Sequence, residues 1–205
     1  MKVLMLNGSP KPSGNTALAL AEVRQTLMQE GIDVVYYDIG QLALRGCIAC
    51  GKCRELGRCV FDDIVNELAG VFRECDGLVV GSPVYYASAN ATLIALLDRL
   101  FYSTPYAKSM KVGFAVTVAR RGGASATFDE LNKYFTISGM PVVSGQYWNS
   151  VHGMTPGEAA RDEEGMQNMR TLARNAAFLI KSIALGKAEY GLPATEGRLR
   201  TNFIR

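Results

Sequence analysis

Residues 2–16 read KVLMLNGSPKPSGNT, in which a short apolar run leads into a loop of small and turn-forming residues. An amphipathic helical pattern follows at once, so the stretch predicts a strand, a loop and a helix. Backbone N–H groups of such a loop point inward, and the start of a helix favours an anion. We therefore expect a phosphate cradle here, formed by Ser9, Lys11, Ser13, Gly14, Asn15 and Thr16. The simpler alternative is an ordinary loop capped by Ser or Thr.

The spacing of the glycines in this loop indicates which kind of phosphate group it could bind. It has neither the GxxxxGK[ST] pattern of nucleoside triphosphatases nor the GxGxxG pattern of dinucleotide folds. The loop therefore favours a terminal monophosphate over a pyrophosphate.

Apolar runs alternate with amphipathic segments along the rest of the chain. We expect strands at 2–6, 33–39, 77–81, 111–118 and 141–147, and helices at 16–30, 61–74, 90–102, 125–137 and 162–185. Runs that are apolar throughout suit strands buried on both faces. The sequence predicts one α/β domain over residues 1–205: a flavodoxin-like, doubly wound, five-stranded parallel sheet of order 2-1-3-4-5 with helices on both faces.

In such a sheet the loops after strands one, three and four meet at one crevice. The second of these loops, SPVYYASAN at 82–90, is expected to flank a planar ring such as a flavin through Pro83, Val84, Tyr85, Tyr86 and Ala87. The alternative is that one tyrosine packs beneath the loop.

The third loop, TVARRGGA at 117–124, is rich in glycine, which permits a close approach of the backbone. Its expected role is to stabilise negative charge on a reduced flavin, through Ala119, Arg120, Gly122 and Gly123. Arg120 and Arg121 equally suit a contact with the phosphate of NADPH, or solvent.

Composition excludes several classes of protein. The chain has 205 residues, 48% of them hydrophobic, and a net charge of +3, which argues against a nucleic-acid surface. No apolar stretch is long enough for a signal peptide or a membrane span, so a cytoplasmic protein is expected. Five cysteines in such a chain suggest metal ligands or redox groups rather than disulfides.

The three loops together resemble the NADPH-dependent FMN reductases and flavodoxin-type quinone reductases, over about residues 1–185. The resemblance implies bound FMN, NAD(P)H as cosubstrate, and a small acceptor such as a quinone or a flavin.

The cysteine-rich loop at 46–60, GCIACGKCRELGRCV, resembles that of archaeal and bacterial iron-sulfur flavoproteins. This resemblance implies one [4Fe–4S] cluster with four ligands, and assembly as homodimers or homotetramers. The implied ligands are Cys47, Cys50, Cys53 and Cys59. Tetrahedral zinc and an empty loop remain alternatives, because four thiols also satisfy zinc. Cys75 stands apart and is expected to be a buried apolar residue.

The resulting hypothesis is an FMN-dependent oxidoreductase of the NAD(P)H-dependent FMN or quinone reductase type, with no catalytic acid or base required. The rival is an electron carrier that takes single electrons from a ferredoxin-like partner through a [4Fe–4S] cluster. A third alternative is a binding module without redox activity.

Two segments near the end of the chain lie outside the three loops and the cysteine-rich loop. Trp148 and His152, the only Trp and His, lie in a segment that suits a contact between subunits. The alternative for His152 is a structural hydrogen bond, which is the commoner role of a lone His. The tail from about 187 carries Arg198, Arg200 and Arg205 and is expected to be solvated or in contact with another subunit.

Overall fold

The computed structural model describes residues 1–197, 199–201, 203 and 204. Its sheet has five strands in the order β2-β1-β3-β4-β5, and every neighbouring pair is parallel. The predicted fold class and strand order are confirmed. The strands are β1 (Lys2–Asn7), β2 (Asp33–Asp38), β3 (Gly77–Pro83), β4 (Val112–Ala119) and β5 (Ser150–His152).

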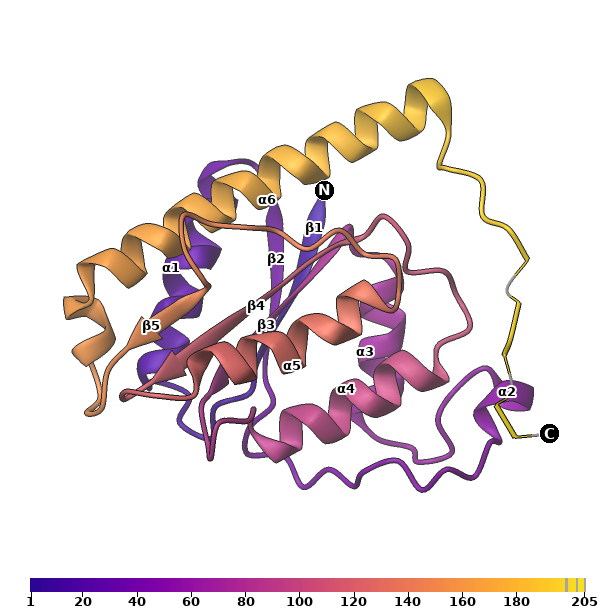
Figure 1. Cartoon of the computed structure of the whole chain (residues 1–205), viewed down its shortest axis with the longest axis horizontal. Coiled ribbons are helices and arrows are strands. Elements are labelled where there is room, and N and C mark those ends of the chain that lie inside the picture. Colours follow the sequence, from indigo (N-terminus) through magenta and orange to yellow (C-terminus); the bar gives the residue numbers. More distant parts are fainter. Residues whose placement is uncertain (198, 202, 205) are drawn as a thin grey trace.

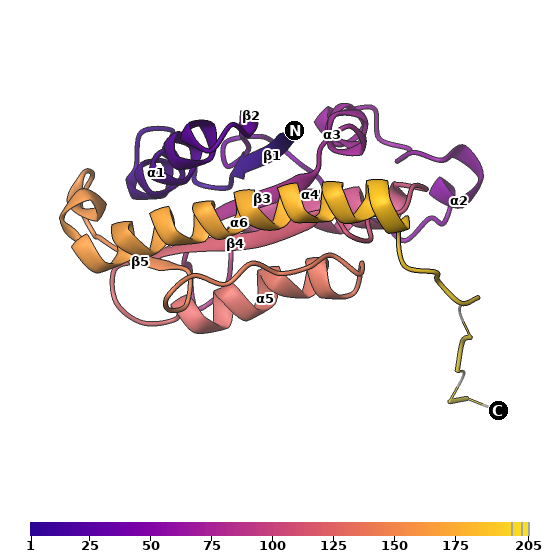
Figure 2. The same cartoon turned by 90° about the horizontal axis from the view of Figure 1, so that it is seen from above.

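Helices cover both faces of the sheet (Figures 1 and 2). One face packs against α1 (Asn15–Gln29) and α6 (Glu163–Tyr190), and the other against α3 (Ile64–Arg73), α4 (Ala91–Ser103) and α5 (Ala124–Thr136). Two short elements were not predicted, the helix α2 (Cys53–Leu56) and the 3-10 helix η1 (Glu158–Arg161). Figure 1 shows α2 at the edge of the molecule, beyond the end of α4.

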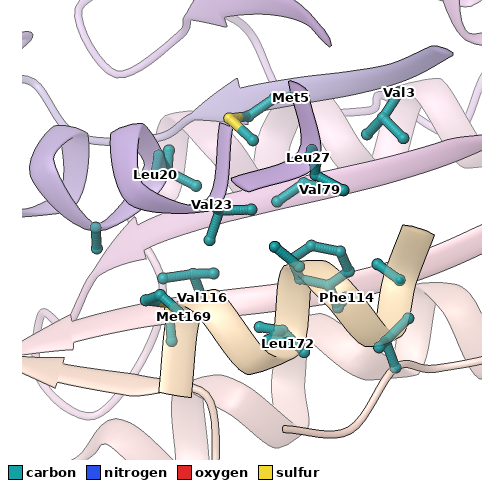
Figure 3. Close-up of a cluster of buried hydrophobic side chains, with 14 of the residues drawn as sticks. Val3, Met5, Leu20, Val23, Leu27, Val79, Phe114, Val116, Met169 and Leu172 are labelled. Carbon is teal, nitrogen blue, oxygen red and sulfur yellow. The ribbon is translucent and has the colours of Figure 1, made fainter. Parts of the chain in front are cut away.

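The core has two layers because the central strands are apolar on both faces. Figure 3 shows the layer between the sheet and the helices α1 and α6, where Leu20 and Val23 of α1 and Met169 and Leu172 of α6 meet side chains of the sheet. In β4, Phe114 belongs to this layer, whereas the next residue, Ala115, belongs to the layer under α3, α4 and α5. Side chains that alternate between two buried faces explain the continuous apolar runs in the sequence.

The position of the fifth strand was predicted incorrectly. Residues 141–147 contribute only an isolated bridge, between Val142 and Gly113, and the strand itself is Ser150–His152. The carboxamide of Asn168 on α6 accepts a hydrogen bond from Gln146 N at 2.7 Å and donates one to Trp148 O at 3.0 Å. Asn168 therefore satisfies backbone groups of this segment, which rejoins the sheet only at Ser150.

The last helix continues to Tyr190, so the predicted tail begins at Gly191. Figure 2 shows the described residues after α6 extending away from the sheet. Arg200 is exposed, and Arg198 and Arg205 lie outside the described residues. Within the described part of the chain, no helix is long and apolar enough to cross a membrane.

Candidate functional site

The loop between β1 and α1 is held by its own backbone and short side chains. Ser9 N donates to Asn7 Oδ1 at 3.0 Å, and Ser9 Oγ accepts a hydrogen bond from Lys11 N at 3.1 Å. The residue before α1 is Gly14, which supplies no side-chain cap. Because no side chain caps this turn, the first N–H groups of α1 suit an anion.

The six predicted cradle residues differ in exposure. Ser9, Gly14 and Thr16 are buried, Asn15 is half-buried, and Lys11 and Ser13 are exposed. The side chain of Asn15 has a structural role, since it donates to Thr155 O at 2.9 Å and accepts from the N–H groups of Gly157 and Ala159. Asn15 thereby joins the cradle to the segment that leads into η1.

The loop after β3 forms a tight turn that displays both of its tyrosines. Tyr85 and Ser88 exchange backbone hydrogen bonds of 2.9 and 3.0 Å, and the two residues between them, Tyr86 and Ala87, have φ values of 52° and 59°. Two central residues with positive φ are typical of type I′ turns, which usually carry Asn or Gly there. Tyr85 and Tyr86 are both exposed, so neither packs beneath the loop.

A carboxylate from α5 anchors this turn. Glu130 accepts the Ser88 hydroxyl and the N–H of Ala89, the latter at 2.8 Å. Sequence reasoning missed Glu130 because it looks like an ordinary polar residue on a helix. Only the folded chain brings it to the turn.

The loop after β4 packs directly on the same turn. Gly123 has φ of 92°, and a Cβ atom there would lie 2.9 Å from Ala87 Cα and 3.0 Å from Val84 Cγ1. Arg120, Arg121 and Gly122 are exposed, whereas Ala119 is buried at the end of β4. Like α1, α5 begins without a side-chain cap.

The three predicted loops therefore meet at the carboxyl edge of the sheet. Gly8 N donates to Gly81 O at 2.7 Å, and Val84 N donates to Val118 O at 2.9 Å. This edge offers uncapped helix starts, hydroxyls, glycine backbone and exposed aromatic rings. These groups fit FMN, which has a monophosphate at one end and a planar ring at the other.

A second candidate site lies in the cysteine-rich loop. Its four cysteines line a single pocket together with Arg99, Tyr102 and Ser103 of α4. All are free thiols, with Cys47 and Cys50 exposed and Cys53 and Cys59 half-buried. In the described residues, no group of three or more His, Cys, Asp or Glu side chains is arranged to hold a metal ion.

Arg99 is the main buried charge beside this pocket, with only 1% of its side chain exposed. Its guanidinium forms a two-pronged ion pair with Asp63, both bonds being 2.8 Å, and its Nε lies 3.3 Å from Cys59 Sγ. Burial alone would lower the pKa of Arg99, but the hydrogen bonds to Asp63 and Cys59 outweigh it and the pKa is raised. The one available sequence signal was a lone arginine within an apolar stripe of a helix.

The helix α4 joins the two candidate sites. Its first residue, Ala91, follows the tyrosine turn, and Arg99 lies about 12 Å further along the helix axis. The carboxyl edge of the sheet and the cysteine pocket therefore lie toward opposite ends of α4.

The remaining singled-out residues lie outside both sites. Cys75 is 1% exposed within the apolar core, as predicted, and burial raises the pKa of its thiol. Trp148 and His152 are exposed, and His152 Nδ1 lies 3.4 Å from a carboxylate oxygen of Asp162.

Residues 1–155 match the family described as NADPH-dependent FMN reductase. An iron-sulfur flavoprotein of Methanocaldococcus jannaschii is 34% identical over 194 residues, covering 89% of this chain and 99% of that protein. An iron-sulfur flavoprotein of Methanosarcina thermophila is 30% identical over 187 residues, covering 89% and 97%.

Solved structures share the fold at low identity. RosB with a bound riboflavin-phosphate intermediate has a TM-score of 0.71 at 16% identity, covering 100% of this chain and 92% of that chain. The NAD(P)H:quinone oxidoreductase of Methanothermobacter marburgensis has a TM-score of 0.66 at 18% identity, covering 85% and 95%.

Proposed function

We propose that this chain, which belongs to the NADPH-dependent FMN reductase family, is an FMN-dependent oxidoreductase that also holds a [4Fe–4S] cluster in its cysteine pocket. The cluster would be held by Cys47, Cys50, Cys53 and Cys59. The described residues contain no group arranged around one metal ion, but each cysteine of a [4Fe–4S] cluster binds a different iron, so the four thiols need not meet at one point. FMN would be held at the carboxyl edge of the sheet.

One observation carries the cluster: four free cysteines from a short segment line the same pocket. Four thiolates are the usual ligand set of a [4Fe–4S] cluster. The pocket also contains a buried hydroxyl oxygen, Ser103 Oγ, that has no hydrogen-bond partner among the described residues. Two relatives of at least 30% identity bear the name iron-sulfur flavoprotein, which supports the proposal that this chain also holds a cluster.

The proposed role of the chain at the FMN site is to bind and orient. The hydroxyls of Ser9, Ser13 and Thr16, the charge of Lys11 and the first turn of α1 would receive the phosphate. The turn that contains Tyr85 and Tyr86 would flank the ring, and the glycine loop at 122–123 would let backbone N–H groups approach it.

When bound, FMN supplies hydride and single-electron chemistry and the cluster supplies single-electron chemistry. The protein positions these groups and sets the polarity around them. This division of labour requires no catalytic acid or base.

A second candidate is an NAD(P)H-dependent FMN or quinone reductase whose cysteine loop holds no cluster. It is favoured by the exposed Arg120 and Arg121 beside the tyrosine turn, which suit the phosphate groups of a pyridine nucleotide. Steady NAD(P)H oxidation with an added quinone would support this candidate, whereas reduction only by a reduced ferredoxin would favour the electron carrier.

The first experiment is purification without air, followed by an absorption spectrum and assays of iron and acid-labile sulfide. About four irons per chain together with flavin bands are expected. Cys59→Ser should lose iron, whereas Cys75→Ala is the matched control and should keep it, because Cys75 lies in the apolar core. Flavin without iron or sulfide in the wild-type protein would contradict the cluster and leave the second candidate.

A further inference from the structure

Two polar side chains from one face of α4 line the cysteine pocket. Arg99 and Ser103 lie four residues apart and therefore project from the same side of the helix. Both are buried, at 1% and 5% exposure, and their neighbours in the helix, Leu96 and Leu100, are core residues. Burying a polar group on an apolar face costs free energy unless the group is hydrogen-bonded, so both side chains are expected to have partners in the pocket.

The guanidinium of Arg99 is fixed in position by its other bonds. It forms the paired bonds to Asp63 and a third bond, of 3.1 Å, to Arg45 O. Asp63 is itself fixed, because it caps α3 by accepting from Val65 N. A planar guanidinium held in this way has one remaining direction for its Nε–H, and that direction leads to Cys59 Sγ at 3.3 Å.

Ser103 has the complementary property of a donor without an acceptor. Its Oγ is buried and has no hydrogen-bond partner within the described part of the chain. A helical hydroxyl commonly bonds the carbonyl one turn back, and the adjacent Thr104 does so with Leu100 O at 2.8 Å. Buried hydroxyls are normally satisfied, so an acceptor is missing from the pocket that Ser103 lines.

We propose that Arg99 and Ser103 are positioning residues that tune the reduction potential of the group held by the four cysteines, an inference that rests on the proposed function. Arg99 donates its Nε–H to the Cys59 sulfur, and Ser103 donates its hydroxyl to a sulfur within the pocket. Hydrogen bonds and positive charge at the sulfurs favour the electron-rich state, so both residues raise the reduction potential.

The test is a redox titration of anaerobically purified holoprotein, monitored by electron paramagnetic resonance. Ser103→Ala and Arg99→Lys should each make reduction at least about tenfold less favourable, which is 59 mV for one electron. Ser103→Thr keeps the hydroxyl and should restore the wild-type potential. Arg54→Lys is the matched control, because it makes the same change of side chain at an arginine of the cysteine-rich loop that bonds Tyr102 Oη rather than a cysteine.

A second measurement separates folding from tuning. Hydrogen exchange on the iron-free protein should show faster exchange over residues 45–63 in Arg99→Lys, because that variant loses the bond to Arg45 O. Ser103→Ala should leave this exchange unchanged, so its altered potential would not come from a loosened loop.

Two results have distinct meanings. Wild-type protein without iron and sulfide would contradict the proposed function itself. A fully loaded wild type whose potential is unchanged by Ser103→Ala and is shifted by Arg99→Lys no more than by Arg54→Lys would overturn this inference alone.

Discussion

The carboxylate of Glu130 accepts the hydroxyl of Ser88 at 2.9 and 3.0 Å, although the two residues are 42 positions apart. The same carboxylate accepts the N–H of Ala89, so α5 holds one side of the tyrosine turn. Two residues of that turn, Tyr86 and Ala87, have positive φ, which is unfavourable for side chains with a Cβ atom. Glu130 therefore stabilises a turn whose backbone alone does not favour this shape.

Glu130→Ala should weaken FMN binding about tenfold, or about 1.4 kcal/mol, because the released turn no longer holds its shape against the ring. Titration of the iron-free protein with FMN, followed by the quenching of flavin fluorescence, measures this change. Asp129→Ala is the control, since Asp129 is an exposed acidic neighbour on the same helix. Equal FMN affinities for the two variants would show that the anchoring bonds do not shape the site.

Gly123→Ala should impair FMN binding more strongly than Gly122→Ala. At Gly123 an added Cβ would meet Ala87 Cα at 2.9 Å, and φ is 92°, whereas Gly122 has no atom within 4 Å of an added Cβ. The strained variant should lose about 1–3 kcal/mol of unfolding free energy as well. Denaturant unfolding and FMN titration on both variants check this, and a Gly123→Ala protein indistinguishable from Gly122→Ala would refute the close contact of the two loops.

The sequence was sufficient to predict the sheet because its central strands are apolar on both faces. The side chains of Phe114 and Ala115 point to opposite layers, so the pattern of β4 is continuous and easily recognised. The fifth strand was misplaced for a physical reason: residues 141–147 begin with an apolar run, but the side chain of Asn168 bonds the backbone of Gln146 and Tyr147. A contact from α6 decides where the chain joins the sheet, and such a long-range contact cannot be read from a local sequence pattern.

Some features of the candidate sites could likewise be predicted from local sequence, and others depend on contacts between distant segments. The loops rich in glycine and hydroxyls and the cysteine spacing are local signals, and the structure brings the three loops to one edge and the cysteines to one pocket. Glu130 and Arg99 bond residues of distant segments, and only the folded chain brings Ser103 to the cysteine pocket, so no spacing rule could identify them. Asn15 was predicted as a cradle residue, and its side chain turns out to bond the segment 155–159.

Asn15→Ala should lower the free energy of unfolding by about 1–3 kcal/mol, because the N–H groups of Gly157 and Ala159 lose their acceptor. Asn15→Asp keeps an acceptor and loses only the bond to Thr155 O, so its loss should be smaller. Urea unfolding of the two variants measures the difference. The same stability for both would mean that the acceptor bonds contribute little.

Lys108→Met should make the protein more stable at neutral pH, and the gain should shrink as the pH rises. Lys108 is 8% exposed. Its Nζ makes long bonds of 3.3 and 3.4 Å to Thr104 O and Tyr106 O and lies 5.0 Å from the centroid of the Tyr106 ring. Among the described residues no carboxylate pairs with it in an ion pair. Burial therefore lowers the pKa of Lys108 from its usual 10.5.

The sign of the pH effect follows from proton counting. Between the lowered pKa of the folded state and the normal pKa near 10.5, the unfolded chain binds more protons at Lys108 than the folded chain does. The unfolding free energy of the wild type therefore rises with pH across that window, and the cost of burying the charge is fully present below it. Lys108→Met removes that cost and should raise the free energy of unfolding by about 1 kcal/mol at pH 7. Urea unfolding from pH 7 to 11, with the exposed Lys133→Met as control, tests this; a Lys108→Met curve parallel to the wild type would contradict it.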